Sequence, residues 1–531
     1  MTSSKLSKLI SLVIVSFIIL VAFAPMPVEG RLKSNWSRNY GGEFHDIAHE
    51  VLIGEDGGYL LAGYSNSFGA ERRDQVFLVK TNSNGFTEWR RDIGGEYSDR
   101  GLAATNTDDG GYAIAGLTTS LGGRDNYDFY LIKTDSEGNL EWENNYGGEH
   151  NEIAYDVIQT SDGGYLLGGS TVTYGHRGRD WWIVRTDEEG EKLWSRYHGG
   201  NQDEVLTSVV ETEEGNFVLG GYTASYADPG FGLWTLEIDE DEIDQDKEEE
   251  EFTEKDGVQL TEYLFSLDIE YENYLEEGPI NETLKEAFEE RGHDIEEDAE
   301  LFSERDDREE EDRWFVSGNL EREYRLELGD ELNIYSEKMV IWQTNIGGTL
   351  DDKIHDLIIT QDGGYAAAGE TRSYAEVGSN SWLVKLDSEG KEEWNESFGG
   401  DYEEVAHSLT ESHDGTLLMA GYETTWGGVQ EDFFIVETDE NGEELFRYDT
   451  GGERTDIAYS IITVDENTFA VAGKTRSFGG GGFSFYLVEL GRPTEMSVPL
   501  VLGAVGIGVV GIYAGIKLFK KYRYLFKFKR F

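Results

Sequence analysis

The chain has 531 residues, and its 107 acidic against 44 basic side chains give a formal net charge of −63 at pH 7. Such a surface repels nucleic acid and anionic lipid and attracts cations and basic partners, so nucleic-acid binding is excluded. Cysteine is absent, which excludes disulfides, thiolate metal sites and cysteine nucleophiles. Hydrophobic residues still make up 38% of the chain, so the acidity is expected at the surface of a folded protein.

The N-terminus has the pattern of a secretory signal peptide. Lys5 and Lys8 precede an apolar run from residue 9 to residue 24, as the n-region and h-region of such a peptide do. We assign residues 1–30 to the signal peptide and expect export of the mature chain.

A ten-residue motif then recurs seven times, first as "EDGGYLLAGY" at 55–64 and most clearly again as "SDGGYLLGGS" at 161–170. Its last glycine recurs every 52 or 53 residues, apart from one longer step after the fourth copy: Gly63, Gly116, Gly169, Gly221, Gly369, Gly421 and Gly473. A period near 50 with turn residues throughout is typical of a β-propeller. We expect Asp-Gly to make the turn and the last glycine to let neighbouring blade backbones approach.

Each repeat reads as four short strands; in the first these are "HEVLIG", "YLLAGYS", "QVFLVKT" and "TEWRRDI". A lone strand, "SNWSRNY", precedes the first repeat, and the last repeat stops after "FSFYLVEL" without a fourth strand. The first strand therefore completes the last blade. The prediction is an all-β, seven-bladed propeller, with blades one to four in 31–238 and the rest in 339–491.

The repeats have the general blade plan of WD-repeat propellers. The hairpin "KTDSEGNLEW" at 133–142 is similar to the tryptophan-docking repeat of quinoprotein dehydrogenases and outer-membrane assembly lipoproteins, and it resembles the Asp-box of sialidases. These resemblances imply a fold far more than an activity. They favour a surface propeller of an archaeon or bacterium.

Residues 239–338 interrupt the fourth blade. They begin with an acidic linker and continue with "NETLKEAFEERG", which predicts a short helix, and with segments that predict strands. We expect a small α+β insertion that replaces a hairpin tip.

The C-terminus predicts a membrane anchor. The apolar run 496–516 is long enough to cross a bilayer, and the basic tail 517–531 places that end in the cytoplasm. The body of the chain is then extracellular, on a single-pass membrane protein. Three sequons for glycosylation fit this location: Asn35, Asn281 and Asn395.

Two rings of residues are the candidate sites. Five residues after the first glycine of each Gly-Gly pair stands a carboxylate: Asp46, Asp99, Glu152, Glu204, Asp352, Glu404 and Asp456. Each either accepts backbone N–H bonds from its crossing loop, or the seven together bind a cation, with calcium the candidate because hard cations take oxygen ligands.

The second ring lies five residues after each motif's last glycine and is mostly aromatic: Phe68, Leu121, Tyr174, Tyr226, Tyr374, Trp426 and Phe478. Blade topology puts it on the same face as the carboxylates. The alternatives are interblade packing, or a surface that stacks on sugars or binds a partner peptide.

Evidence for catalysis is thin. His49, His355 and His407 share one inner-strand position, which favours packing, and the sequence has no paired-histidine zinc motif, GxSxG or phosphate loop. No catalytic residue or organic cofactor is predicted. We expect a binding, adhesion or envelope-scaffold module for an extracellular protein or glycan; the alternative is a propeller hydrolase or oxidoreductase acting on envelope polysaccharide.

Overall fold

The computed structural model describes residues 32–68, 72–123, 126–175, 178–227, 230–239, 340–375, 377–400, 402–424 and 430–492. The predicted signal peptide, insertion, membrane helix and basic tail lie outside these ranges, as do Asn281 and Trp426. Within the ranges, no helix is long and apolar enough to cross a membrane.

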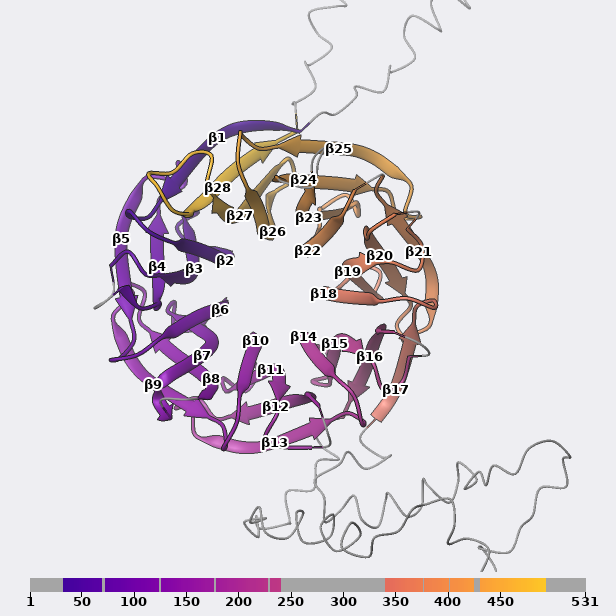
Figure 1. The fold of residues 1–531 in the computed structure, drawn as a ribbon, viewed down its shortest axis with the longest axis horizontal. Coiled ribbons are helices and arrows are strands. Elements are labelled where there is room, and N and C mark those ends of the chain that lie inside the picture. The colour runs from indigo at the N-terminus through magenta and orange to yellow at the C-terminus, as the bar shows by residue number, and fades with distance from the viewer. Residues whose placement is uncertain are drawn as a thin grey trace, which may run out of the picture.

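The described chain forms seven antiparallel four-stranded sheets around a common axis (Figure 1). The first blade is β2 (Asp46–Ile53), β3 (Tyr59–Ser65), β4 (Gln75–Thr81) and β5 (Thr87–Ile93), ordered from the axis outwards. This confirms the predicted all-β, seven-bladed propeller.

The next five blades repeat this order. The second blade is β6 (Asp99–Asn106), β7 (Tyr112–Gly123), β8 (Asn126–Thr134) and β9 (Leu140–Tyr146), and the third is β10 (Glu152–Gln159), β11 (Tyr165–Thr171), β12 (Asp180–Thr186) and β13 (Lys192–His198). The fourth blade is β14 (Glu204–Glu211), β15 (Phe217–Thr223), β16 (Gly232–Ile238) and β17 (Val340–Ile346), and the fifth is β18 (Asp352–Ile359), β19 (Tyr365–Thr371), β20 (Asn380–Leu386) and β21 (Glu392–Phe398). The sixth blade is β22 (Glu404–Glu411), β23 (Leu417–Thr424), β24 (Glu431–Thr438) and β25 (Glu444–Thr450).

The seventh blade joins the two ends of the propeller. It consists of β26 (Asp456–Asp465), β27 (Thr468–Thr475), β28 (Ser484–Gly491) and, outermost, β1 (Lys33–Tyr40). β1 pairs antiparallel with β28, from Lys33 opposite Gly491 to Tyr40 opposite Phe485. The ring therefore has no unpaired strand edge at the junction of its ends.

The core lies between blades, because the second and third strands of each blade are apolar on both faces. All seven residues of β4 are buried. Between the last and first blades, the rings of Phe77 and Phe485 pack edge to face with centroids 5.2 Å apart. Burial of each such ring contributes about 2–3 kcal/mol.

The motif's glycines have different roles. Gly57 has φ +72°, the left-handed conformation that the turn requires. A Cβ on Gly63 would lie 2.0 Å from the Ile47 carbonyl oxygen. Ile47 belongs to β2 of the same blade, beside a β-bulge between Ala48 and Glu50. The closest approach is thus within the blade. The neighbouring blade is also close, since a Cβ on Gly101 of β6 would lie 3.0 Å from the Gly63 carbonyl oxygen.

Candidate functional site

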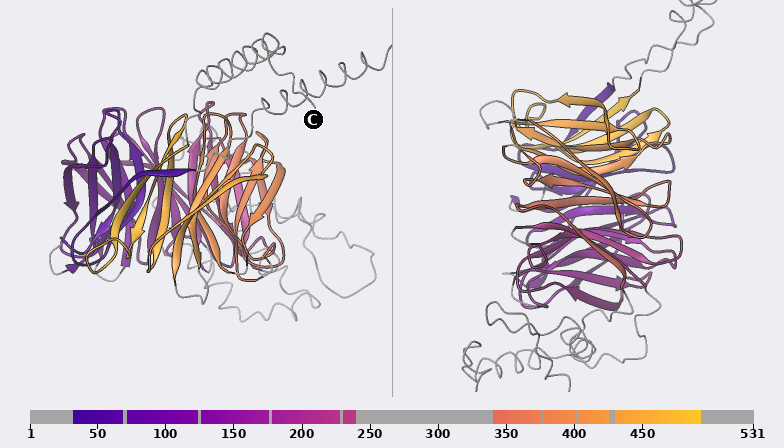
Figure 2. Two further views of the ribbon diagram at one scale, coloured as in Figure 1. Left: turned by 90° about the horizontal axis from the view of Figure 1, so that it is seen from above. Right: turned by 90° about the vertical axis from the view of Figure 1, so that its right-hand side faces the viewer.

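Figure 2 shows the propeller edge-on, and its two faces carry different connections. One face, here called the loop face, carries the crossings between blades and the connections from second to third strands; in the first blade these are 41–45 and 66–74. The other, the turn face, carries the tight hairpin turns, such as 54–58 and 82–86. The described members of both predicted rings lie on the loop face.

The seven carboxylates are buried at the start of the innermost strands. Asp99 shows the usual pattern: Oδ2 accepts the Gly95 N–H at 2.7 Å and the Ser120 hydroxyl at 2.7 Å, and Oδ1 accepts the Thr118 hydroxyl at 2.6 Å. The bond from the Gly-Gly pair recurs at 2.7–2.9 Å for Asp46, Glu152, Glu204, Asp352 and Asp456. Each carboxylate thus anchors its own crossing loop.

Glu404 differs, because its Oε2 accepts a hydrogen bond from Arg447 at 2.8 Å. In the described part of the chain, no group of three His, Asp or Glu side chains has a geometry that could hold a metal ion. The contacts therefore favour the loop-anchoring alternative, and the calcium site stays a prediction.

The second ring lies exposed on the loop face, with 37–46% of each described residue accessible: Phe68, Leu121, Tyr174, Tyr226, Tyr374 and Phe478. The five aromatic members each pack on an aromatic ring of the third strand in their own blade. Centroid distances are 5.0 Å for Phe68–Phe77 and Tyr226–Trp234, 5.2 Å for Tyr174–Trp182 and Phe478–Tyr486, and 6.0 Å for Tyr374–Trp382. We call these five residues the aromatic platforms.

In four blades a shared threonine connects the buried carboxylate to its platform; the first blade has Ser65 in that place. In the fourth blade the Thr223 hydroxyl donates to Glu204 at 3.0 Å and accepts the Tyr226 N–H at 3.2 Å. The same arrangement holds Tyr174, Tyr374 and Phe478. The platform backbone is therefore fixed by the carboxylate through a local side-chain turn, while one face of each ring stays open to solvent.

A second cluster, of histidine and tyrosine side chains, surrounds the axis of the propeller. The sequence indicates it only through the repeat position that the three histidines share. The rings of His49 and His407 lie 4.8 and 5.0 Å from the ring of Tyr459, and His355 lies 5.3 Å from His407. The Lys474 ammonium donates to the Tyr459 hydroxyl at 2.8 Å. Burial lowers the pKa of His49 to about 3 and that of His355 to about 4, so both are neutral at pH 7.

Three further carboxyl groups join neighbouring blades beside this cluster. Asp156 accepts the Val209 N–H at 2.8 Å, Asp356 accepts the Leu409 N–H at 2.7 Å, and Glu50 accepts the Ser460 hydroxyl at 2.5 Å. Burial raises the pKa of Glu50 to about 8 and that of Asp156 to about 7. The sequence could have identified these three carboxyl groups, because they stand at a repeat position where the other blades have alanine or serine.

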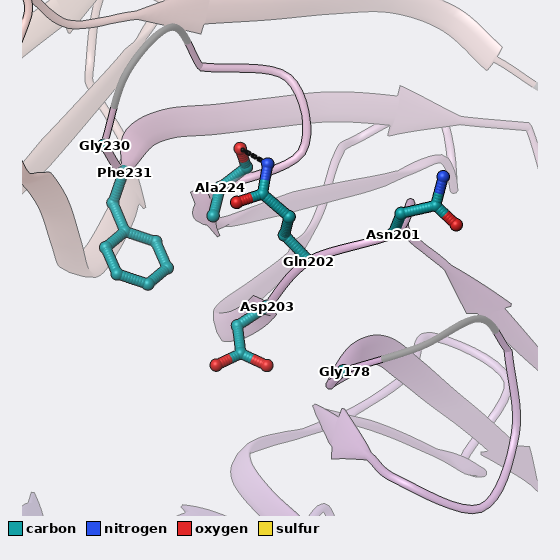
Figure 3. Close-up of a pocket in the computed structure, with 7 residues that line it drawn as sticks. All are labelled: Gly178, Asn201, Gln202, Asp203, Ala224, Gly230 and Phe231. Atoms are coloured by element: carbon teal, nitrogen blue, oxygen red, sulfur yellow. Dashed lines mark hydrogen bonds between the residues drawn. The ribbon is translucent and has the colours of Figure 1, made fainter.

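The loop face also contains a cleft of about 410 Å³ between the third and fourth blades (Figure 3). It is lined by Gly178, Asn201, Gln202, Asp203, Ala224, Gly230 and Phe231. A smaller cleft of about 230 Å³ occupies the equivalent place one blade earlier, lined by Asn126, Glu149, His150, Asn151 and Val172. The sequence analysis identified neither cleft, since no single residue type marks it.

The two described sequons lie on outer strands. The Asn35 side chain donates to Glu489 at 3.0 Å, and the Asn395 side chain donates to Glu392 at 2.6 Å and accepts the Trp382 indole N–H at 3.2 Å. Their glycosylation stays a prediction.

Comparison with known proteins finds no matching family model and no matching curated protein. Solved structures do match. A protein of unknown function from Dyadobacter fermentans shares 11% identity over 87% of this chain and 99% of its own, with a TM-score of 0.41. A polysaccharide lyase, an ulvan lyase, shares 11% over 86% and 97%, with a TM-score of 0.41. Puromycin hydrolase shares 10% over 82% and 53%, with a TM-score of 0.39. Likeness at this level transfers no function to this chain.

Proposed function

We propose that the chain is a membrane-anchored extracellular propeller that binds an extracellular protein or glycan with its loop face, as an adhesion or envelope-scaffold module. The anchoring and the location rest on the sequence alone, on residues 1–30 and 496–516. The binding role rests on the aromatic platforms.

The observation that carries the proposal is the exposure of five aromatic rings at one repeated position. Each is 37–46% accessible although a second ring lies directly behind it. A fixed, exposed aromatic face loses little conformational entropy on binding and stacks on sugars or on apolar side chains. Rings needed for packing alone are normally buried.

The loops beside the platforms add a second argument. The corresponding segments read "GHRGRD", "ADPGFG" and "GGVQED" in the third, fourth and sixth blades, whereas the strands beneath them are alike. Loops that vary in sequence above strands that stay alike are typical of a recognition surface, because loop residues are not constrained by packing in the core.

The test is a binding screen with the full-length protein against a glycan array and an envelope extract. The double variant Tyr374→Ala, Phe478→Ala is screened beside the wild type, because neither side chain makes a polar contact in the described structure. We expect the wild type to bind a glycan or an envelope protein and the variant to lose it. Binding by neither protein would contradict the proposal.

A further inference from the structure

The larger cleft on the loop face has the size and the polar groups of a ligand site. Its volume of about 410 Å³ lies within the roughly 300–1,000 Å³ that is usual for small-molecule pockets. We propose that this cleft binds a neutral polyhydroxy ligand, a sugar residue in the pyranose form. The inference rests on the proposed function, since it assigns a ligand class to part of the same face.

The two clefts differ in the residue that faces the crossing loop. In the smaller cleft, the Asn126 side chain crosses to the opposite wall and donates to the carbonyls of Gly148 and His150 at 3.0 and 3.2 Å. The equivalent residue of the larger cleft is Gly178, which has no side chain. A Cβ there would lie 2.6 Å from the Gln202 carbonyl oxygen. The Gly178 backbone therefore lies directly against the opposite wall, where a side chain would not fit.

The polar groups on the wall of the larger cleft are only partly used by the fold. Asp203 accepts the Arg179 N–H with Oδ1 at 3.0 Å, and within the described residues Oδ2 has no hydrogen-bond partner. The exposed Asn201 amide makes no hydrogen bond to the described part of the chain, so both its donor and its acceptor are available. The Gln202 amide donates to the Ala224 carbonyl at 3.0 Å, which leaves its oxygen open to the cleft (Figure 3).

These groups suit hydroxyl ligands. A sugar hydroxyl both donates and accepts, and amides paired with a carboxylate meet both requirements. Phe231 adds an apolar side (Figure 3), and its ring is held edge to face against Tyr222 at 5.3 Å. Aromatic and apolar surface with a few placed polar groups is the usual composition of such sites.

Charge argues for a neutral ligand. Asp203 is the one carboxylate among the lining residues, and its charge disfavours an anionic ligand. A single carboxylate is also not enough to bind a hard cation, which takes six or more oxygen ligands. Lys353 lies 5.2 Å from the Phe231 ring, but its ammonium faces Glu370 at 3.5 Å. The Lys353 charge is therefore compensated within the protein.

The smaller cleft supplies matched variants. Asp203→Asn copies Asn151, whose Oδ1 accepts the Tyr127 N–H at 3.0 Å as Asp203 accepts that of Arg179. The substitution therefore keeps the structural bond and removes the charged acceptor. Asn201→Ala removes an exposed amide that the fold does not use. Glu149→Ala changes the equivalent of Asn201 in the smaller cleft and is the control.

The experiment is isothermal titration and saturation-transfer NMR of the full-length protein with glucose, galactose, mannose and N-acetylglucosamine, and with glucuronate and glucosamine as charged probes. We expect at least one neutral sugar to bind in the millimolar range. Asp203→Asn should weaken it about tenfold, as expected for loss of a charged acceptor, and Asn201→Ala several-fold, with Glu149→Ala unchanged.

Three results would overturn the inference: no neutral sugar binds, a charged sugar binds more tightly than every neutral one, or both cleft variants bind as the wild type does. Thermal unfolding of each variant shows whether its fold is intact. If the platform variant loses its macromolecular ligand while no sugar enters the cleft, only the cleft inference fails. If sugar binding follows the cleft variants while the platform variant binds normally, only the platform proposal fails.

Discussion

Arg185 Nη2 lies 2.6 Å from Asp162 Oδ2, with the arginine side chain 2% exposed and the aspartate 61%. The aspartate belongs to the repeated Asp-Gly-Gly turn and the arginine to the third strand of the same blade. Lys80, Lys133 and Lys385 pair in the same way with Asp56, Asp109 and Asp362, at 2.7–3.0 Å. Each of these four turns thus brings an exposed carboxylate to a buried cation.

This relationship predicts the cost of losing the turn aspartate. Asp162→Ala leaves the Arg185 guanidinium buried without its carboxylate, so we expect a loss of about 1–3 kcal/mol in unfolding free energy. Chemical denaturation measures it. Glu55→Ala, at an exposed position of an equivalent turn, should change stability by less than about 0.5 kcal/mol. Equal effects of the two variants would show that the pair contributes nothing.

The fourth blade shows why the motif varies. Its third strand has Glu237 where the first, second, third and fifth blades have lysine or arginine, and its turn has Glu214 in place of the aspartate. Instead the Asn216 side chain donates to Glu237 at 2.8 Å. In the looser copy "EEGNFVLGGY" a neutral amide donor to Glu237 thus takes the place of the ion pair.

Stability is expected to fall as pH rises from about 4 to about 8 because of the carboxyl groups that join the blades. Burial, together with the charges of Asp356 and Asp156, raises the pKa of Glu50 to about 8 against the hydrogen bond from Ser460. Burial likewise raises the pKa of Asp156 to about 7. Since both values lie above the roughly 4 of an unfolded chain, the stabilisation is complete below about pH 4 and is lost as pH rises through 7 and 8.

Melting temperatures between pH 6 and pH 9 test this expectation. The wild type should lose stability across that interval, whereas the double variant Glu50→Gln, Asp156→Asn should be much less pH-dependent. The contacts from Ser460 and Val209 are retained by the amide oxygens of the variant. Parallel curves for the two proteins would contradict the assignment.

The closure of the ring depends on a single outer strand. Deletion of residues 32–40 would expose the edge of β28, whose residues from Phe485 to Gly491 pair with β1. We expect a markedly lower melting temperature or aggregation, because an open strand edge pairs with other chains. Calorimetry and light scattering measure both, and a melting temperature equal to that of the full chain would refute the closure.

The insertion enters and leaves the propeller at a hairpin. Ile238 of β16 lies opposite Val340 of β17, and the two strands pair along their length. Replacement of residues 239–338 with Asn-Gly should therefore leave the propeller folded, because a shorter loop costs less closure entropy. Circular dichroism and the melting temperature check this. Loss of folding would mean that part of the insertion belongs to the propeller core.

The sequence predicted the seven blades because the motif's last glycine must lie beside the backbone of the first strand, as Gly63 does beside Ile47. Because the same constraint applies in every blade, the glycine recurs at a regular spacing in the sequence. It also predicted that the carboxylates and the aromatic residues share a face, since both follow fixed strand ends.

The clefts and the axis cluster could not be predicted from the period. The larger cleft is lined by residues from two neighbouring blades. The axis cluster depends on contacts between His355, His407 and Tyr459, which belong to three different blades. Such features arise where blades differ, and their geometry requires the closed ring. The exposed fraction of each residue in the aromatic ring likewise required the structure.

The most direct test of the account compares two faces of the same protein. Tyr374→Ala, Phe478→Ala removes two platforms from the loop face, and Leu193→Ala, Leu445→Ala removes exposed apolar side chains, 51% and 55% accessible, near the turn face. With the ligand found by the screen, a binding titration measures Kd for the wild type and both variants. The account predicts loss of binding in the platform variant alone, at an unchanged melting temperature. Equal Kd values for the platform variant and the wild type, or a loss confined to the turn-face variant, would contradict it.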